Sequence, residues 1–275
     1  MSSKTRVQYT VDGGVAEILI DNPRRRNALD LQGWLDLGRA LEEASIDASV
    51  RVVVLTGKDG DLCSGMDLGD PDSPDHPLNS MRILNRVAQR LFDMPKPVVG
   101  VVDGVAVGAG LSLALACDFV LATPDSRFSA IFARRGLSLD CGAAWGLMRH
   151  NDLHTAKRVT MLGEMIGGKE ALSLGWATWL VDPSELADQR NALVARLLSM
   201  SPRALAESKT LLNHAACSTL ADSLSMEALA QTVNMATDAP EAFDAFSERR
   251  DPQFDGRWRV QATSEVETTT CKDSQ

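Results

Sequence analysis

The sequence is poor in aromatic residues and in positive charge. Only 5% of its 275 residues are aromatic, with a single tyrosine, and 28 basic side chains face 37 acidic ones, a formal charge of −9. Proteins that coat DNA, RNA or anionic membranes need a basic face that releases counterions. We therefore expect no nucleic-acid partner and no membrane partner.

The chain also lacks clustered cysteines and a secretory leader. Its five cysteines are scattered, with no C-x-x-C pair and no Cys/His ligand spacing, which predicts a reducing compartment and no metal site. Residues 1–7 contain no apolar run of the kind that opens a signal peptide, so we expect a cytoplasmic protein.

One apolar run is long enough to span a bilayer, but its composition argues against that role. Residues 98–117 are almost all small and apolar, yet Asp103 and four glycines interrupt them. The first half is rich in valine and the second half in leucine and alanine. We interpret the run as a buried strand, a glycine-rich turn and a buried helix.

The first half of the chain alternates strand and helix patterns. Strands are expected at residues 15–20, 50–55, 98–102 and 119–122, and helices at 29–44, 81–92 and 111–116. Residues 69–80 are rich in Asp and Pro, which is typical of a loop. Strands separated by helices predict an α/β fold whose parallel sheet has crossover connections.

The second half is predicted to be almost entirely helical. Helices are expected at residues 154–174, 185–200, 202–215, 219–236 and 240–250, and a polar, disordered tail at its end. We divide the chain into a core at 1–200, a C-terminal helical oligomerisation region at 201–258 and a tail at 259–275. Another subunit is a natural partner for the apolar faces of these last helices.

Three segments place glycine or proline where the backbone makes a close approach. Residues 22–29 end a strand with Arg24, Arg25 and Arg26, which suit either a solvated basic turn or phosphate binding. Residues 55–68 expose backbone donors around Gly65, and residues 103–111 open a helix whose first N–H groups carry the positive end of its dipole. The last two segments together predict a site with two donors for an anion.

In this order and spacing, the segments resemble the crotonase (enoyl-CoA hydratase/isomerase) superfamily over residues 7–256. Matching stretches continue at Cys117-Asp118, at residues 135–137, at 162–164 with 171–175, and at 245–254. The resemblance implies a crotonase-like spiral of ββα repeats, C-terminal helices that build a trimer or a dimer of trimers, and an acyl-coenzyme A thioester as substrate. No separate cofactor is implied, because coenzyme A enters as part of the substrate.

The resemblance also implies an oxyanion hole, in which two backbone N–H groups hold the thioester oxygen as it becomes an enolate. By position these are the amides of Met66 and Ala109, and preorganised donors of this kind lower a barrier by roughly 3–4 kcal/mol each. The substrate site is then expected to include the surrounding residues Ala28, Ser64, Gly65, Asp67, Leu68, Gly108 and Gly110. Arg24, Arg25 or Arg26 would face the coenzyme A phosphates, and Arg249 or Arg250 would reach them from a neighbouring subunit.

The departures from the family pattern bear on the reaction. Two glutamates activate water in hydratases of this family, and the corresponding positions here carry Ser112 and Phe132. A serine hydroxyl cannot by itself take up a proton at neutral pH. By the same resemblance, Asp140 occupies the position where some isomerases of the family carry a catalytic aspartate. It also suits the N-cap of a helix that starts near Cys141. Asp67, Asp70, Asp72, Asp75 and His76 are further candidates beside the loop.

Three functions follow from this pattern. We favour an isomerase in which Asp140 shuttles a proton. The alternatives are a weak or atypical hydratase that uses water held by Ser112 together with another carboxylate, and a protein that binds acyl-CoA without catalysis. Other phosphate-binding motifs fit poorly. Residues 163–170 lack the hydroxyl residue of a phosphate loop, and residues 104–110 have the wrong glycine spacing for a dinucleotide site.

Overall fold

A six-stranded sheet forms the centre of the computed structural model, which describes residues 6–67 and 76–259. Its strands lie in the order β1-β2-β3-β4-β6-β9, and all neighbouring pairs are parallel except β1 with β2. The strands are β1 (Arg6–Asp12), β2 (Val15–Asp21), β3 (Val52–Gly57), β4 (Val98–Val102), β6 (Phe119–Ala122) and β9 (Trp179–Leu180). The predicted parallel α/β sheet is confirmed, and β1 is a strand that the sequence patterns missed.

A smaller second sheet lies beside the first. It contains β5 (Val105–Val107), β7 (Arg127–Ser129) and β8 (Ile166–Gly167), and an isolated bridge adds Cys63 to it through Ala106. Successive units of the chain thus place one strand in the large sheet, one extended segment in the small sheet and then a helix: β3 and Cys63 precede α2, and β4 and β5 precede α3. The ββα spiral expected from the resemblance is present.

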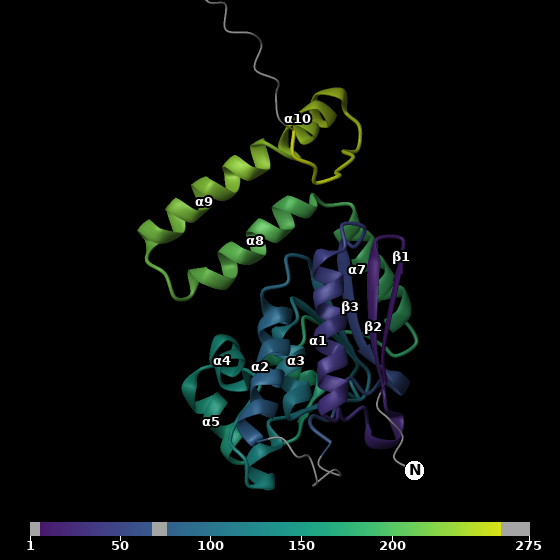
Figure 1. The fold of residues 1–275 in the computed structure, drawn as a ribbon, viewed down its shortest axis with the longest axis vertical. Coiled ribbons are helices and arrows are strands. Elements are labelled where there is room, and N and C mark those ends of the chain that lie inside the picture. The colour runs from purple at the N-terminus through teal and green to yellow at the C-terminus, as the bar shows by residue number, and fades with distance from the viewer. Residues whose placement is uncertain (1–5, 68–75, 260–275) are drawn as a thin grey trace, which may run out of the picture.

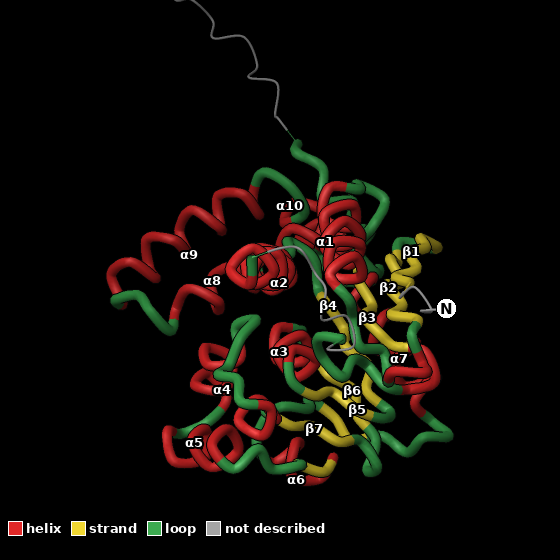
Figure 2. The backbone as a smooth tube through the Cα atoms, turned by 60° about the horizontal axis from the view of Figure 1, so that its bottom comes forward, coloured by secondary structure: helices red, strands yellow, loops and turns green. Residues whose placement is uncertain are grey.

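Helices cover both faces of the large sheet (Figure 2). On one face lie α1 (Leu31–Ile46), α2 (Pro77–Phe92) and α3 (Ala109–Ala116), which share one hydrophobic cluster with Val53 and Leu55 of β3; on the other, α7 (Leu186–Leu198) shares a second cluster with Val52 and Val54. A parallel strand buried on both faces needs apolar residues at consecutive positions. This explains the unbroken β-branched run of β3.

The remaining helices extend the molecule on either side of the core (Figure 1). After the small sheet come α4 (Ala143–His150), α5 (Leu153–Met161) and α6 (Gly168–Ser173), and the chain ends in α8 (Pro202–Ala215), α9 (Leu220–Met235) and α10 (Ala239–Glu248). Short 3₁₀ turns occupy Pro23–Arg25, Lys58–Gly60 and Ile131–Arg135. Figure 1 shows α8 and α9 as an antiparallel pair that projects from the core. Each helix in the described part of the chain is too short or too polar to cross a bilayer.

Two boundaries differ from the sequence prediction. The helix expected at 81–92 begins earlier, at Pro77, because the His76 side chain accepts a hydrogen bond from the Leu78 N–H and Pro77 suits the first helical turn. The helix expected at 154–174 is divided instead: α5 ends at Met161, Gly163 takes a positive φ of 57°, and β8 intervenes before α6. The predicted polar loop, apart from its end in α2, and the predicted tail lie outside the described residues.

Candidate active site

Backbone hydrogen bonds hold the segment around Met66 against Leu29 and leave the Met66 N–H directed away from Leu29. Leu29 N–H donates to the Gly65 carbonyl and Asp67 N–H donates to the Leu29 carbonyl, both over 2.9 Å. In this parallel bridge Met66 lies opposite Leu29, and its N–H points to the other side of the extended chain. Among the described residues, no acceptor takes the Met66 N–H, which leaves it available to a ligand.

The second donor lies at the start of α3. Ala109 is the first residue of this helix, and its N–H likewise has no acceptor within the described segments. Glycines bring the two donors together. A Cβ on Gly65, whose φ is +97°, would lie 3.3 Å from the Ala109 nitrogen, and a Cβ on Gly110 would lie 1.9 Å from the Cys63 carbonyl oxygen. Side chains at these positions would separate the two segments.

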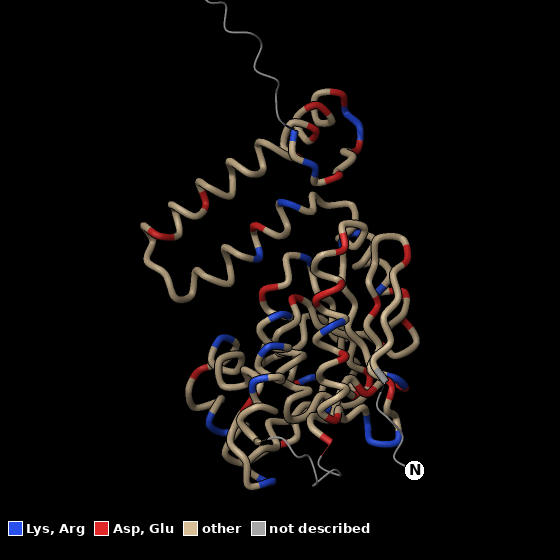
Figure 3. The backbone as a smooth tube through the Cα atoms, viewed as in Figure 1, with Lys and Arg blue, Asp and Glu red and all other residues tan. Residues whose placement is uncertain are grey.

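Buried asparagines shape the turn that carries the three arginines. Asn22 donates to the Ala28 carbonyl over 2.9 Å, and Asn27, at a positive φ of 58°, donates to the Lys58 carbonyl over 2.9 Å. The arginine side chains between them are exposed, and Figure 3 shows them as a run of positive charge after β2. Arg25 reaches the site, where its Nη1 lies 3.9 Å from Asp67 Oδ1. Arg24 and Arg26 are exposed and do not line the cavity that Arg25 lines.

These segments line one cavity of about 460 Å³. It brings together most of the residues predicted from the sequence: Arg25, Ala28, Ser64, Gly65, Met66, Asp67, Gly108, Ala109, Phe132 and Asp140. Ser64 is fixed there by its hydroxyl, which donates to the Arg25 carbonyl over 2.8 Å. Gly110 lies behind the wall, against Cys63. Leu68 is outside the described residues, as are Asp70, Asp72 and Asp75.

Asp140 is the carboxylic acid that the cavity isolates most from water. Burial raises the pKa of its carboxyl to about 6, and its Oδ1 is buried without a hydrogen-bond partner. The alternative role as a helix N-cap is wrong: Gly142 is the N-cap of α4, and Asp140 contributes only its main-chain carbonyl, which accepts from Ala143 N–H over 2.9 Å. The carboxyl group is therefore left free for chemistry.

Ser112 and Phe132, at the two hydratase positions, are both buried. The Ser112 hydroxyl donates to the Asp140 carbonyl oxygen over 3.2 Å, and Phe132 contributes an apolar wall to the cavity. Neither supplies a carboxylate. Burial also raises the pKa of the nearby Cys63 thiol to about 12, so this cysteine is not a thiolate nucleophile.

Arg250 lies away from this cavity in the same subunit. Its guanidinium binds Glu241 through two hydrogen bonds of 2.6 and 3.0 Å and Glu248 through one of 2.6 Å, which fixes it against α10. The part of the chain that the structure describes contains no group of three or more His, Cys, Asp or Glu side chains that could hold a metal ion.

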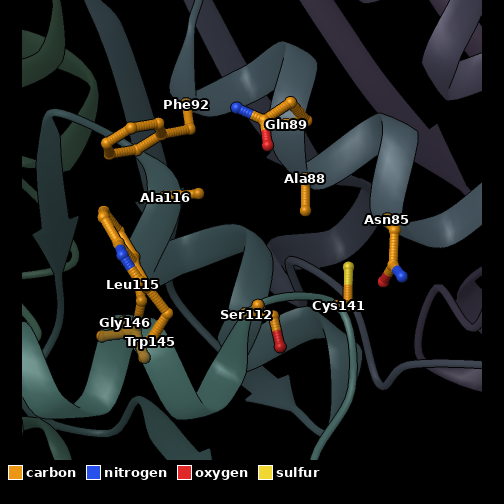
Figure 4. A pocket seen from close by; sticks show the side chains of 11 residues that line it. Asn85, Ala88, Gln89, Phe92, Ser112, Leu115, Ala116, Cys141, Trp145 and Gly146 are labelled. Atoms are coloured by element: carbon orange, nitrogen blue, oxygen red, sulfur yellow. The ribbon is translucent and has the colours of Figure 1, made fainter. Parts of the chain in front are cut away.

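A second cavity, of about 490 Å³, shares no lining residue with the first, although its Cys141 directly follows Asp140 in the chain (Figure 4). Three helices and the segment after Asp140 line it: α2 contributes Asn85, Ala88, Gln89 and Phe92, α3 contributes Ser112, Leu115 and Ala116, and the region of α4 contributes Cys141, Gly142, Trp145 and Gly146. Figure 4 shows Ser112 and Cys141 at one end and the Phe92 and Trp145 rings at the other. The sequence analysis missed this cavity.

Two kinds of residue escaped the sequence analysis. Arg135 lines the first cavity and has no carboxylate partner within 4 Å among the described residues; it stands beside Gly136 in one of the matching stretches, which was the available signal. The α2 residues of the second cavity recur at helical spacing of three and four, a pattern that indicates one helix face. Their facing partners on α3 and α4 follow the same spacing, but the sequence does not show that these three faces meet.

Comparison with known proteins agrees with this geometry. The family model described as "Enoyl-CoA hydratase/isomerase" matches residues 10–257. The chain is 32% identical to "1,2-epoxyphenylacetyl-CoA isomerase" of Escherichia coli K12, covering 90% of this chain and 97% of that protein, and 29% identical to "(E)-benzylidenesuccinyl-CoA hydratase" of Thauera aromatica, covering 91% and 99%. A crystal structure of an enoyl-CoA hydratase from Polaromonas sp. JS666 superposes with a TM-score of 0.85 at 31% identity, over 90% of this chain and 99% of that one.

Proposed function

Because the chain belongs to the enoyl-CoA hydratase/isomerase family, we propose that it is an acyl-CoA isomerase in which Asp140 moves a proton between carbon atoms of the acyl group. One observation carries the proposal. Asp140, whose buried Oδ1 has no hydrogen-bond partner, lines the same cavity as the backbone segments of Met66 and Ala109. A base and an oxyanion hole are the two groups that this reaction needs.

In the proposed mechanism, the Met66 and Ala109 N–H groups hydrogen-bond the thioester oxygen. The Asp140 carboxylate removes a proton from one carbon of the unsaturated acyl group, and the electron pair moves into a dienolate whose oxygen the two donors stabilise. The protonated Asp140 then returns the proton to a different carbon, which shifts the double bond. No atoms are gained or lost, and no further reactant is needed.

The raised pKa of Asp140 suits both halves of this cycle. A carboxyl with a pKa of about 6 is largely ionised at pH 7 and so can accept a proton. It is also a stronger base than an exposed aspartate, because burial disfavours its charged form. The desolvation that makes ionisation costly thus adds to the driving force of proton removal.

Hydration is the second candidate function, and the Thauera relative, named as a hydratase, favours it. Hydration requires a water molecule activated on one face of the double bond, and Ser112 and Phe132 supply no carboxylate for this. The E. coli relative is named as an isomerase, and both names describe acyl groups that contain a ring. The lack of the glutamate pair favours the isomerase.

Product analysis distinguishes the candidates. The enzyme is incubated in D₂O with 3-enoyl-CoA and 2-enoyl-CoA thioesters, and the products are analysed by mass spectrometry. Isomerisation yields products with the atoms of the substrate, apart from deuterium in place of hydrogen where the acid exchanges with solvent, whereas hydration adds one molecule of D₂O. Asp140→Asn is expected to abolish isomerisation. Turnover unchanged in that variant would contradict the role of Asp140, and binding without any product would favour a non-catalytic acyl-CoA-binding protein.

We further propose that the coenzyme A phosphates lie along the turn of Arg24, Arg25 and Arg26, and that the protein self-associates as a trimer or a dimer of trimers through its C-terminal helices. Support for assembly comes from exposed apolar side chains on α8, α9 and α10, among them Leu212, Leu220, Leu229 and Phe246. Figure 3 shows few charges along α9. Light scattering coupled to size-exclusion chromatography measures the subunit number, and a monomer would contradict this assembly.

A further inference from the structure

We propose that the second cavity binds a ring-bearing acyl group against Trp145 and Phe92, and that Arg149 positions this aromatic wall. The inference rests on the proposed function, because it concerns the substrate of the same reaction. It adds the class of acyl group and the residues that select it.

The second cavity is placed to receive the acyl atoms beyond the reacting carbons. Two segments contribute to both linings: α3 supplies Ala109 to the first cavity and Ser112 to the second, and the segment before α4 supplies Asp140 to the first and Cys141 to the second. Three residues of α-helix advance about 4.5 Å, or three to four carbon–carbon bonds. A thioester whose oxygen lies at Ala109 therefore directs its chain past Asp140 and toward the rings of Trp145 and Phe92.

The far end of the cavity is an aromatic wall. The Phe92 and Trp145 rings meet edge to face, with their centroids 4.5 Å apart and their planes at 82°. Aromatic rings add stacking or edge-to-face attraction to the burial of area, which a straight alkyl chain does not receive. The sides of the cavity, by contrast, carry the small residues Ala88, Ala116 and Gly146. Small sides and an aromatic end favour a flat, wide group over a thread-like one.

Arg149 holds this wall from outside the cavity. Its Cζ lies 4.1 Å from the Trp145 ring centroid, within the range of a cation–π interaction. Its Nη2 donates to the Asn213 carbonyl of α8 over 2.7 Å, and the Asn213 side chain donates to the Phe92 carbonyl over 3.2 Å. Arg149 and Asn213 thus link the helices that carry both rings. Arg149 is a positioning residue, since it does not line the cavity.

The test compares two substrates with the same number of acyl carbons, 5-phenylpent-3-enoyl-CoA and 3-undecenoyl-CoA. The wild-type enzyme is expected to have the higher kcat/KM for the phenyl substrate. Trp145→Leu should lower the phenyl-to-alkyl ratio of kcat/KM by about three- to tenfold, as expected for loss of an aromatic pair. Trp145→Phe, which keeps a ring, should retain most of the ratio. Trp179→Leu is the matched control, because Trp179 is also half-exposed and stacked on a phenylalanine but lines neither cavity.

Arg149 is tested by the same ratio. Arg149→Leu should lower the phenyl-to-alkyl ratio of kcat/KM through a higher KM for the phenyl substrate, with kcat for the alkyl substrate unchanged. Arg149→Lys, which keeps the positive charge, should retain part of the ratio. An equal loss on both substrates would indicate a general structural role and overturn the positioning role. A wild-type enzyme that prefers the alkyl substrate, or a ratio unchanged by Trp145→Leu, would overturn the proposed acyl class.

A binding experiment separates this proposal from the proposed reaction. The saturated thioesters 5-phenylpentanoyl-CoA and undecanoyl-CoA cannot isomerise, and their Kd values are measured by calorimetry on wild-type, Trp145→Leu and Trp179→Leu proteins. The aromatic wall is supported if the phenyl thioester binds more tightly than the alkyl thioester and if Trp145→Leu, but not Trp179→Leu, removes this difference. This holds even if no isomerase activity is found. Isomerase activity that depends on Asp140, with equal Kd values for both thioesters, would overturn the wall and leave the reaction standing.

Discussion

The Ser112 hydroxyl donates a hydrogen bond of 3.2 Å to the main-chain carbonyl of Asp140. This contact ties α3, whose first residue is a proposed oxyanion donor, to the segment that carries the proposed base. The carbonyl also accepts from Ala143 N–H, so both of its lone pairs are engaged. In the proposed mechanism the base and the oxyanion hole thereby share one support, and the serine takes no part in proton transfer.

Ser112→Ala is therefore expected to reduce kcat without abolishing activity. Loss of one neutral hydrogen bond costs about 1 kcal/mol, which corresponds to a roughly fivefold effect if it acts wholly on the position of Asp140. Ser129→Ala is the matched control, because Ser129 is also buried and its hydroxyl donates to the Gly163 carbonyl, away from Asp140. Steady-state rates and thermal unfolding of both variants check this. A loss as complete as that of Asp140→Asn would mean that Ser112 has a chemical role.

Activity is expected to depend on pH through Asp140. Only the ionised carboxylate can remove a proton, so kcat/KM should rise with pH through about 6 and level off above it. The pH profile of kcat/KM on a 3-enoyl-CoA measures this. A profile flat between pH 5 and 8 would contradict Asp140 as the base.

Stability should respond to the same group in the opposite direction. The folded-state pKa of about 6 lies above the value of about 4 for an unfolded aspartate. The folded protein thus binds the proton more tightly, and the free energy of unfolding contributed by this group falls as pH rises from about 4 to about 6. At pH 8, Asp140→Asn should be at least as stable as wild type in urea unfolding while lacking activity. A clearly less stable variant would indicate that the ionised carboxylate is structurally satisfied.

The sequence could nominate the two backbone donors, Met66 and Ala109, because glycines mark the close approach of their segments. A Cβ on Gly110 would collide with Cys63, and Gly65 combines a positive φ of +97° with close contact to Ala109; glycine at such positions is visible in the sequence. Asp140 could be nominated but its role could not be decided, because both an N-cap and a base require a short polar side chain near a helix start. The aromatic wall could not be predicted, since it joins α2 to α4 across more than fifty residues and depends on tertiary packing.

Ala109→Pro tests the proposed hydrogen bond from the Ala109 N–H to the thioester oxygen. Proline lacks the N–H but fits the first position of a helix, so α3 can be retained while this donor is lost. The proline ring also fills the space of the missing N–H. Activity should fall by about 100- to 1,000-fold, the effect of removing one oxyanion donor. Leu153→Pro is the control, because Leu153 is the exposed first residue of α5 and makes no contact with either cavity. Near-wild-type activity of folded Ala109→Pro would exclude this amide from the reaction.

One ion pair with little exposure helps to attach α8 to the core, in addition to the contacts of Asn213. Lys209 Nζ donates to Asp118 Oδ2 over 2.7 Å, and the same carboxylate oxygen accepts from the Val98 N–H at the start of β4. Removing one partner of such a pair leaves a poorly solvated charge, so Lys209→Met should lower the free energy of unfolding by about 3 kcal/mol. The double variant Lys209→Met with Asp118→Asn should lose less than the two single variants summed, because it leaves no unpaired charge. Arg39→Met, which removes an exposed pair with Asp36, should cost less than about 1 kcal/mol. Urea unfolding of wild type, the two single variants and the double variant measures the coupling. Additive losses would show that Lys209 and Asp118 do not stabilise each other.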